Sequence, residues 1–240
     1  MKANKFDKIK IISFDAFNTL FNAKSYHEDA CKIILDLYTE KRNRKIDVYE
    51  FHKRWDQLII NGWERLNDID QEFKTQKEFF LDTIIQLFNE YDIQGDPKKA
   101  LQIWYDLLEN IELFEEVPEV LDIIKDKGYP IMILSNIDND FLYNNLKKFS
   151  LTNKFDYIFT SENLKAYKPH IRIFKKVLTH IQLNSNEILH IGDSQHADVF
   201  GAKNAGFYAA YLNRKNSPLK KHIPKPDLII NNLKELLKFI

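Results

Sequence analysis

Residues 11–20 are Ile11-Ile12-Ser13-Phe14-Asp15-Ala16-Phe17-Asn18-Thr19-Leu20, an apolar run that ends in an aspartate and continues into a polar turn. A second segment repeats this pattern far along the chain, where the run 188–191 is followed by Gly192-Asp193-Ser194 and then by Asp198. Open α/β sheets bind their ligands just beyond the carboxyl ends of the strands. We therefore expect Asp15 and Asp193 to meet at one edge of a parallel sheet, where two carboxylates can share a metal ion.

The chain from residue 117 onward alternates short apolar runs with helical patterns. The runs expected as strands are 131–134, 157–159, 188–191, 208–212 and 228–230, and a last helix follows residue 230. Short apolar strands that alternate with helices are typical of a parallel sheet covered on both faces. The run before Asp15 has the same character. The predicted fold class is therefore α/β, with a doubly wound, Rossmann-like parallel sheet.

Residues 23–108 have a different sequence pattern, with apolar residues at helical spacing throughout. Asp47, Thr75 and Asp96-Pro97 each fit the start of a helix, since acidic and hydroxyl side chains cap helices and proline suits the first helical position. This helical block interrupts the alternation after its first strand. We therefore expect an inserted α-helical domain at 23–108 and an α/β core formed by 1–22 and 109–240.

The composition limits the classes of partner. Hydrophobic residues make up 44% of the 240 residues, enough for a packed core, and 35 basic side chains balance 35 acidic ones. A balanced charge offers no attraction to nucleic acid or to an acidic membrane, and no apolar run approaches the roughly 20 residues that span a bilayer. Residues 1–8 are too polar for a signal peptide, and the single cysteine, Cys31, cannot form an internal disulfide. We expect a cytoplasmic monomer or homodimer without nucleic-acid or membrane partners.

Four short motifs occur in order along the chain. They are Phe14-Asp15-Ala16-Phe17-Asn18-Thr19-Leu20, Ile133-Leu134-Ser135-Asn136, Ala166-Tyr167-Lys168-Pro169 and Ile191-Gly192-Asp193-Ser194, the last continued by Asp198. Each motif alone is weak, but the ordered set, placed at strand ends and helix starts, resembles the haloacid dehalogenase-like (HAD) hydrolase superfamily. The resemblance covers nearly the whole chain. It implies that the helical insert is the cap domain found in this superfamily.

The residue types in these motifs also indicate a chemistry. A carboxylate fixed at a strand end can attack an electrophilic centre and form an ester that water then cleaves, which suits Asp15. Lys168 offers a positive charge that would keep Asp15 ionised, while Ser135 or Asn136 can donate hydrogen bonds to the substrate. Asp15 and Asp193 together form an oxygen site suited to Mg²⁺.

The resemblance extends these assignments. It implies that the carbonyl oxygen of Phe17 is a further Mg²⁺ ligand, and that Asp198 either binds the metal through water or orients Lys168. We expect catalytic roles for Asp15, Thr19, Ser135, Asn136 and Lys168, substrate contacts from Phe17, Asn18, Ser135, Asn136 and Lys168, and metal ligands among Asp15, Phe17, Asp193 and Asp198. The expected substrate is a small anionic molecule. His190, within an apolar run, is predicted to be a packed and hydrogen-bonded core residue.

Phe17 departs from the phosphatase pattern. Phosphatases of the superfamily carry a second aspartate at this position, which protonates the leaving group, and the loss of such an acid costs about 10²–10⁴ in rate. The first motif and Tyr167-Lys168-Pro169 instead resemble the 2-haloacid dehalogenases, in which halide leaves without a proton. Gly192-Asp193 resembles the Mg²⁺-dependent members, and a buried carboxylate facing Asp15 without a cation would be electrostatically costly.

Three functions remain open at this point. The favoured one is a Mg²⁺-dependent hydrolase that acts on a small phosphorylated or other anionic compound. The alternatives are a metal-independent 2-haloacid dehalogenase and a non-catalytic protein that keeps the scaffold to bind a ligand or partner. Metal dependence separates the first two functions. The joint presence of Asp15, Lys168 and Asp193 argues against the third, although Phe17 argues for it.

Overall fold

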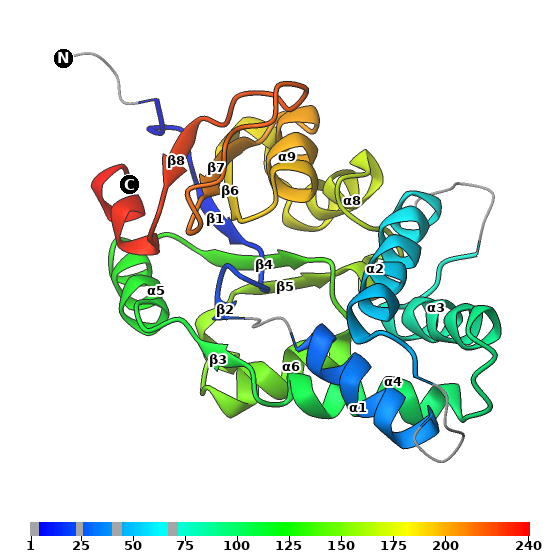
Figure 1. Ribbon diagram of the computed structural model, residues 1–240. Coiled ribbons are helices and arrows are strands. Elements are labelled where there is room, and N and C mark those ends of the chain that lie inside the picture. Colours follow the sequence, from blue (N-terminus) through cyan, green and yellow to red (C-terminus); the bar gives the residue numbers. More distant parts are fainter. Residues whose placement is uncertain (1–4, 23–25, 40–44, 67–71) are drawn as a thin grey trace. The chain divides into compact units, whose positions relative to one another are not determined.

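The computed structural model describes residues 5–22, 26–39, 45–66 and 72–240. The chain divides into two compact units, one formed by Met1–Asn22 with Leu113–Ile240 and the other by Ala23–Glu112. The first unit contains a large sheet and the second is helical, as Figure 1 shows. Two short strands, β2 (Phe21–Asn22) and β3 (Glu112–Leu113), pair with each other. The assignment of the helical unit as a cap stays a prediction.

The first unit is built on a six-stranded sheet in the order β5-β4-β1-β6-β7-β8, in which all neighbouring strands are parallel. The strands are β1 (Ile11–Phe14), β4 (Ile131–Ser135), β5 (Tyr157–Thr160), β6 (Ile188–Gly192), β7 (Tyr208–Leu212) and β8 (Leu228–Ile230). Every residue of β1, β4 and β6 is buried, which explains why these strands are continuous apolar runs rather than alternating ones. The predicted α/β fold class and parallel sheet are confirmed.

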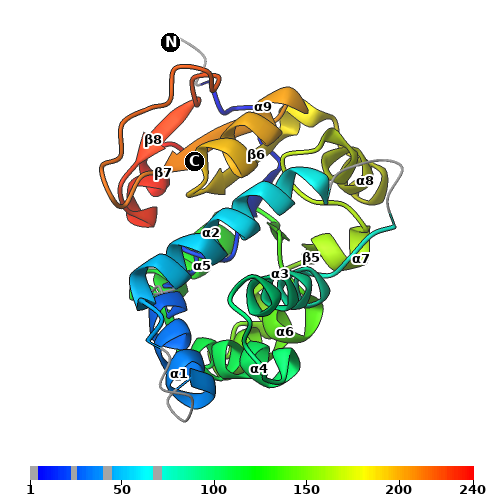
Figure 2. The same ribbon diagram turned by 45° about the vertical axis from the view of Figure 1, so that its right-hand side comes forward.

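Helices cover both faces of this sheet. They are α5 (Val117–Asp126), α6 (Asn139–Lys148), α7 (Ser161–Leu164), α8 (Ile171–Ile181) and α9 (Gly201–Asn204), with the short 3₁₀-helices η2 (Thr152–Lys154) and η3 (Ser185–Glu187) and the π-helix η4 (Gln195–Phe200). Figures 1 and 2 show α8 and α9 together on one side of the sheet, where they share a core cluster with Ile11 and Met132. The predicted last helix is instead a 3₁₀-helix, η5 (Leu233–Lys238), with i→i+3 bonds such as that from the N–H of Phe239 to the carbonyl oxygen of Leu236.

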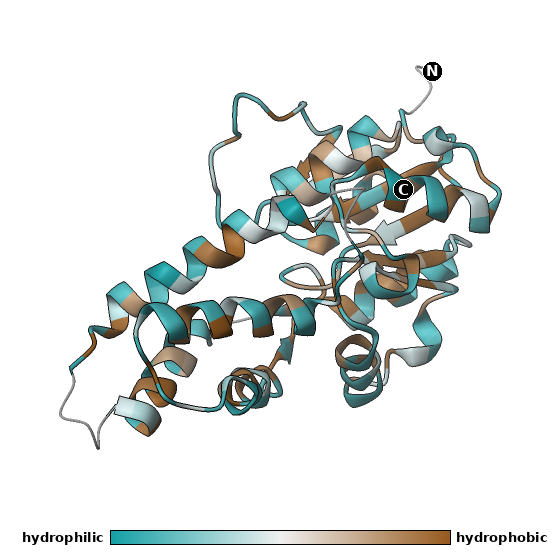
Figure 3. Ribbon diagram, turned by 90° about the vertical axis from the view of Figure 1, so that its right-hand side faces the viewer, coloured by the Kyte–Doolittle hydropathy of each residue, from teal (hydrophilic) through white to brown (hydrophobic). Residues whose placement is uncertain are grey.

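The described residues of the second unit form four helices around their own apolar core. They are α1 (His27–Thr39), α2 (Val48–Arg65), α3 (Gln76–Glu90) and α4 (Pro97–Leu108). Both α1 and α3 pack against α2 and α4. Figure 3 shows apolar and polar residues interspersed along these helices, as expected of helices that bury one face. The predicted starts are confirmed, because Asp47 and Thr75 cap α2 and α3 and Pro97 opens α4. None of the described helices combines the length and the apolar character needed to cross a bilayer.

Candidate active site

The strand order of the sheet reverses at β1, and open α/β sheets bind their ligands at the carboxyl end of the strands at such a point. The chain passes from β1 to β4 and β5 on one side, and β6, β7 and β8 continue on the other side. Asp15 follows β1 directly, Ser135 ends β4 and Gly192 ends β6. The backbone N–H of Asp15 donates to the carbonyl oxygen of Ile191 at 2.8 Å, which fixes the aspartate at this edge. The sheet therefore brings three of the four motifs together.

Lys168 from the third motif lies at the centre of this site. Its Nζ donates to Oδ1 of Asp15 at 2.7 Å, to Oδ1 of Asp198 at 2.6 Å and to the carbonyl oxygen of Leu134 at 2.7 Å. An ammonium group has three donors, so all of them are committed within the protein. Burial works to lower the pKa of Lys168, but the two carboxylates outweigh it and raise that pKa. Lys168 therefore carries a fixed positive charge, and its predicted contact with substrate stays a prediction.

Asn136 holds the backbone of Lys168 in place. Its Nδ2 donates to the carbonyl oxygen of Lys168 at 2.9 Å, and its Oδ1 accepts from the Lys168 N–H at 2.7 Å. Both ends of the amide are therefore engaged with one peptide segment. We propose that Asn136 is a positioning residue for Lys168, while the predicted hydrogen bond from Ser135 or Asn136 to substrate stays a prediction. Ser135 itself is buried at the end of β4.

Asp198 is oriented by a buried hydrogen-bonded chain. Its Oδ1 contacts Nε2 of His190 at 3.1 Å, and Nδ1 of His190 lies 2.8 Å from the hydroxyl of Ser13. Its Oδ2 accepts the backbone N–H of Ser194 at 2.9 Å. Gly192 makes room for this carboxylate, since a Cβ there would overlap the carboxyl group. His190 is packed and hydrogen-bonded in the core, as predicted, but its bond to a predicted site residue was missed.

A sequence signal for this chain of contacts exists. Ser13 and His190 are polar residues inside two apolar runs, and the register of β1 and β6 places them side by side. Burial works to raise the pKa of Asp198, but Lys168 and His190 outweigh it and hold the pKa below its ordinary value. Burial lowers the pKa of His190, which keeps the imidazole neutral. The hydrogen bonds from Ser13 through His190 thus hold the ionised carboxylate of Asp198 in a fixed orientation.

The three aspartates form a site with unbalanced charge. Asp15, Asp193 and Asp198 offer ligand oxygens that all lie within 4.8 Å of one another. When ionised, they carry three negative charges, of which Lys168 pairs with those of Asp15 and Asp198, while Lys168 and Lys215 both act to lower the pKa of Asp193. Burial, together with Asp15 and Asp198, raises the pKa of Asp193 to about 8. Burial likewise raises the pKa of Asp15 in spite of Lys168. The donor set and the charge both fit a hard divalent cation such as Mg²⁺.

The turn after Asp15 is held by contacts within the first unit. Asn18 has a positive φ of 55°, and its N–H donates to the carbonyl oxygen of Phe21 at 2.7 Å. Arg214 donates from Nε to the Asn18 carbonyl oxygen at 3.3 Å and from Nη2 to that of Thr19 at 3.0 Å. Its Nη1 pairs with Glu116 at 2.6 Å. Arg214 was not among the residues predicted from the sequence, because it lies in a loop without a motif.

Two predicted residues of this turn lie in different surroundings. The ring of Phe17 is half-buried and stacks on Phe141, with centroids 5.4 Å apart and an interplanar angle of 16°. The hydroxyl of Thr19 is fully buried and has no hydrogen-bond partner among the residues that the structure describes. The catalytic role of Thr19, the substrate contacts of Phe17 and Asn18, and the metal-ligand role of the Phe17 carbonyl oxygen stay predictions.

Comparison with known proteins places these features in a family. The model of the haloacid dehalogenase-like hydrolase family matches residues 65–211, more than half of the chain. Haloacid dehalogenase-like hydrolase domain-containing protein 3 of Xenopus laevis is 27% identical over 65% of this chain and 66% of that protein. (S)-2-haloacid dehalogenase 4A of Burkholderia cepacia is 29% identical over 52% of this chain and 54% of that protein. Pyrophosphatase PpaX of Bacillus thuringiensis is 27% identical over 55% of this chain and 61% of that protein. The chain thus spans about half to two thirds of the length of the curated relatives it matches.

Solved structures show the same fold. L-2-haloacid dehalogenase from Xanthobacter autotrophicus has a TM-score of 0.72 at 18% identity, covering 96% of this chain and 97% of that one. The HAD-hydrolase YfnB from Bacillus subtilis, bound to magnesium, has a TM-score of 0.73 at 22% identity over the same shares. The chain belongs to the haloacid dehalogenase-like hydrolase family. The predicted family is confirmed.

Asp193→Asn is expected to stabilise the metal-free protein at pH 8. The pKa of Asp193 in the folded protein is about 8 against an ordinary value of 3.8. The folded state therefore holds its proton more tightly than the unfolded state, and metal-free stability falls as the pH rises between these values. The amide removes this loss, so thermal denaturation in EDTA should show a melting temperature higher by a few degrees, about 2–4 °C for each kcal/mol.

The same variant tests the metal site. Mg²⁺ should raise the melting temperature of the unmodified protein and leave that of Asp193→Asn nearly unchanged. Asp140→Asn, an exposed carboxylate on α6, serves as the matched control and should behave like the unmodified protein. A lower melting temperature for Asp193→Asn than for the unmodified protein in EDTA at pH 8 would contradict the charge argument.

Proposed function

We propose that the protein is a Mg²⁺-dependent hydrolase that uses Asp15 as its nucleophile on a small phosphorylated or similar anionic compound. The observation that carries this proposal is the convergence of Asp15, Asp193 and Asp198 beside Lys168. The three carboxylates together have more negative charge than the lysine offsets, and a divalent cation would balance the remainder. Asp15, Asp193 and Asp198 would hold the ion. When bound, Mg²⁺ would supply positive charge that offsets the charge of the substrate.

In the proposed reaction, Asp15 attacks the substrate and Lys168 holds Asp15 in place. Lys168 binds Oδ1 of Asp15, so the other carboxylate oxygen is the one that attacks phosphorus. That attack forms an aspartyl phosphate bond and breaks the bond between phosphorus and the leaving oxygen. Water then cleaves the acyl phosphate and restores the carboxylate. Because Asp198 and His190 fix Lys168, the positive charge beside Asp15 needs no rearrangement during the reaction.

Phe17 restricts the leaving group. A phenyl ring cannot give a proton to a departing oxygen, so the proposal favours leaving groups that depart as stable anions. Phosphoanhydrides, acyl phosphates and aryl phosphates meet this condition, whereas simple alkyl phosphates do not. The pyrophosphatase among the relatives supports the first of these classes.

A 2-haloacid dehalogenase is the second candidate. The half-buried aromatic pair of Phe17 and Phe141 favours it, since halide leaves carbon without a proton and an apolar surface suits a haloalkyl group. In that reaction Asp15 would form a bond to carbon as the carbon–halogen bond breaks. The unbalanced charge around Asp193 argues against it, because that chemistry needs no cation.

One set of assays separates the candidates. Purified protein, with Mg²⁺ or with EDTA, is given pyrophosphate, an aryl phosphate, an alkyl phosphate and 2-chloropropionate, and released phosphate and chloride are measured. Phosphate release that requires Mg²⁺ is the expected result, and chloride release in EDTA would establish the dehalogenase instead. The absence of both products would overturn the enzymatic proposal in favour of a binding role for the scaffold.

Phe17→Asp is expected to speed the hydrolysis of an alkyl phosphate up to about 100-fold while changing aryl phosphate hydrolysis much less. The new carboxyl group would supply the missing proton donor, and general acid catalysis contributes about 10²–10⁴ in rate. Phe17→Ala, which removes the ring without adding an acid, is the matched control. If the alanine variant gains as much as the aspartate variant, the effect is one of space, and the explanation by leaving-group protonation fails.

A further inference from the structure

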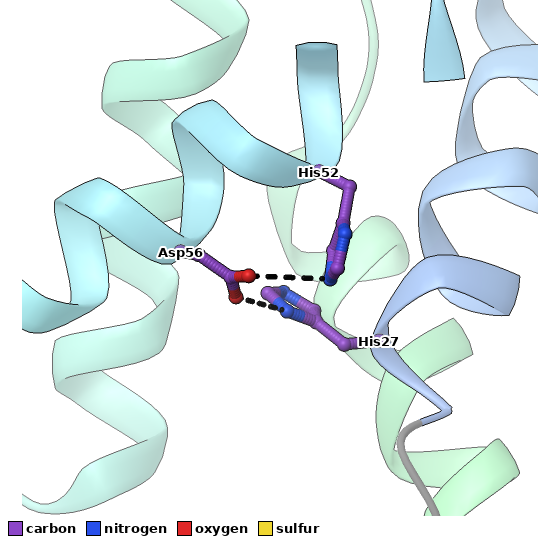
Figure 4. Close-up of side chains that lie close together, drawn as sticks. All are labelled: His27, His52 and Asp56. Carbon is purple, nitrogen blue, oxygen red and sulfur yellow. Dashed lines mark hydrogen bonds and ion pairs between the residues drawn. The ribbon is translucent and has the colours of Figure 1, made fainter. Parts of the chain in front are cut away.

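A second cluster of potential metal ligands lies in the helical unit, apart from the three aspartates. His27 opens α1, and His52 and Asp56 lie one turn apart on α2. Nδ1 of His27 is 2.9 Å from Oδ1 of Asp56, and Nε2 of His52 is 3.4 Å from Oδ2 of the same carboxylate. Figure 4 shows both rings directed at this carboxylate from the two helices. All three residues belong to one compact unit.

The spacing of these atoms matches a tetrahedral metal ion. One ligand atom from each residue lies within 4.8 Å of the others. Zinc binds nitrogen and oxygen ligands at about 2.0–2.1 Å, so the ligands of a tetrahedral ion lie roughly 3.3 Å apart. The distances from His27 Nδ1 to Asp56 Oδ1 and from His52 Nε2 to Asp56 Oδ2, 2.9 and 3.4 Å, fall on either side of this value. Small side-chain rotations would therefore complete the site.

His27 is held ready for such a role. Its ring lies against Trp55 and Trp104, with centroids 4.1 and 5.1 Å away, which fixes the ring orientation. Its Nε2 is buried and has no hydrogen-bond partner within the described part of the chain. Nδ1 must be free of its proton to bind a metal, and a neutral imidazole can carry that proton on Nε2 instead. Because nothing is bonded to Nε2, this change of tautomer breaks no hydrogen bond there.

The cluster is also accessible from solvent. The side chains of His27, His52 and Asp56 are 10%, 19% and 46% exposed, so the carboxylate end opens outward while the first imidazole is enclosed. A metal ion can therefore enter beside Asp56, and a water molecule can occupy the remaining position.

We propose that His27, His52 and Asp56 bind a first-row divalent transition-metal ion, with Zn²⁺ as the favoured ion, and that this ion ties α1 to α2. Two imidazoles and one carboxylate are a donor set that transition metals prefer and Mg²⁺ does not. Water or a small anion completes the coordination. The ion is a structural clamp within the helical unit, independent of the reaction proposed at Asp15.

Zinc binding to the full chain tests this proposal. EDTA-treated, dialysed protein is titrated with Zn²⁺ by calorimetry in excess Mg²⁺, which occupies the carboxylate site. The expected result is one Zn²⁺ per chain and a rise in melting temperature on binding. His52→Gln and Asp56→Asn, both at partly exposed positions, should lower the zinc affinity by about 100-fold or more. His27→Gln is the third variant, with circular dichroism confirming that each variant is folded.

Two controls separate this site from other sources of zinc binding. Glu28→Gln alters an exposed carboxylate next to His27 on α1 and should bind Zn²⁺ like the unmodified protein. Asp193→Asn should also retain the bound zinc. Unchanged zinc affinity in folded His52→Gln and Asp56→Asn would overturn the proposal. So would a loss of the bound zinc in Asp193→Asn, since that ion would then occupy the three-aspartate site.

Discussion

Asp15→Asn is expected to abolish hydrolysis, with a loss of at least about 10⁴-fold in kcat. An amide oxygen is a poor nucleophile at phosphorus or carbon, and removal of a nucleophile that acts with its partners costs up to about 10⁶-fold. The substitution keeps the shape of the side chain, and its carbonyl oxygen can still accept from Lys168. It also removes one negative charge from an overcharged site, so stability should not fall.

The measurement is phosphate and halide release by the variant under the conditions in which the unmodified protein is active. Asp140→Asn is the matched control because it makes the same chemical change at an exposed position of the same unit. A melting temperature at or above that of the unmodified protein separates loss of chemistry from loss of fold. Retention of more than about one per cent of the activity would show that another group attacks the substrate, since a lost nucleophile costs far more.

Lys168→Met is expected to have the largest effect on stability. The lysine side chain is 1% exposed and binds two carboxylates and a carbonyl oxygen, so its removal leaves buried negative charges without a counter-charge. Breaking a buried ion pair in this way costs about 3–5 kcal/mol. For a chain of this size, that corresponds to a fall of about 6–20 °C in melting temperature. Activity should be lost as well, because the ammonium group that binds Oδ1 of Asp15 and holds the nucleophile in place is gone.

A second substitution shows whether charge is the cause. The double variant Lys168→Met, Asp198→Asn removes one of the two carboxylates left without a counter-charge. Its melting temperature should lie between those of Lys168→Met and the unmodified protein, and it should have no activity. Lys175→Met, at an exposed position on α8, controls for the loss of a lysine and should change neither property. If the double variant is less stable than Lys168→Met, lost packing rather than unpaired charge explains the single variant.

The positions of Asp15 and Asp193 at strand ends could be predicted from the sequence, because burial in the sheet requires apolar strands that stand out as runs. Continuous apolar runs locate buried parallel strands, and the residue after such a run must lie at the carboxyl edge, as Asp15 and Asp193 do. The direction of a side chain is not determined in this way. Asn136 follows β4 as predicted, yet its amide turns back onto the Lys168 backbone.

Contacts between segments far apart in the chain could not be predicted from the sequence, for a different reason. Arg214 holds the carbonyl oxygen of Asn18 across 196 residues, and no periodicity links a loop arginine to that turn. His52 and Asp56 have the spacing of one helical turn, but only the packing of α1 against α2 supplies His27. Such partners depend on tertiary structure, which a single sequence leaves open.

If the three-aspartate site binds Mg²⁺ as proposed, the stability of the folded chain depends on the magnesium concentration around it. An ion that binds only the folded state stabilises it by mass action, by about 1.4 kcal/mol for each tenfold rise in concentration above its dissociation constant. Proteases cut chains chiefly in opened states, whose population falls as stability rises. A cell poor in magnesium would therefore degrade this protein faster than a cell rich in it, and the abundance of the protein would follow the magnesium supply.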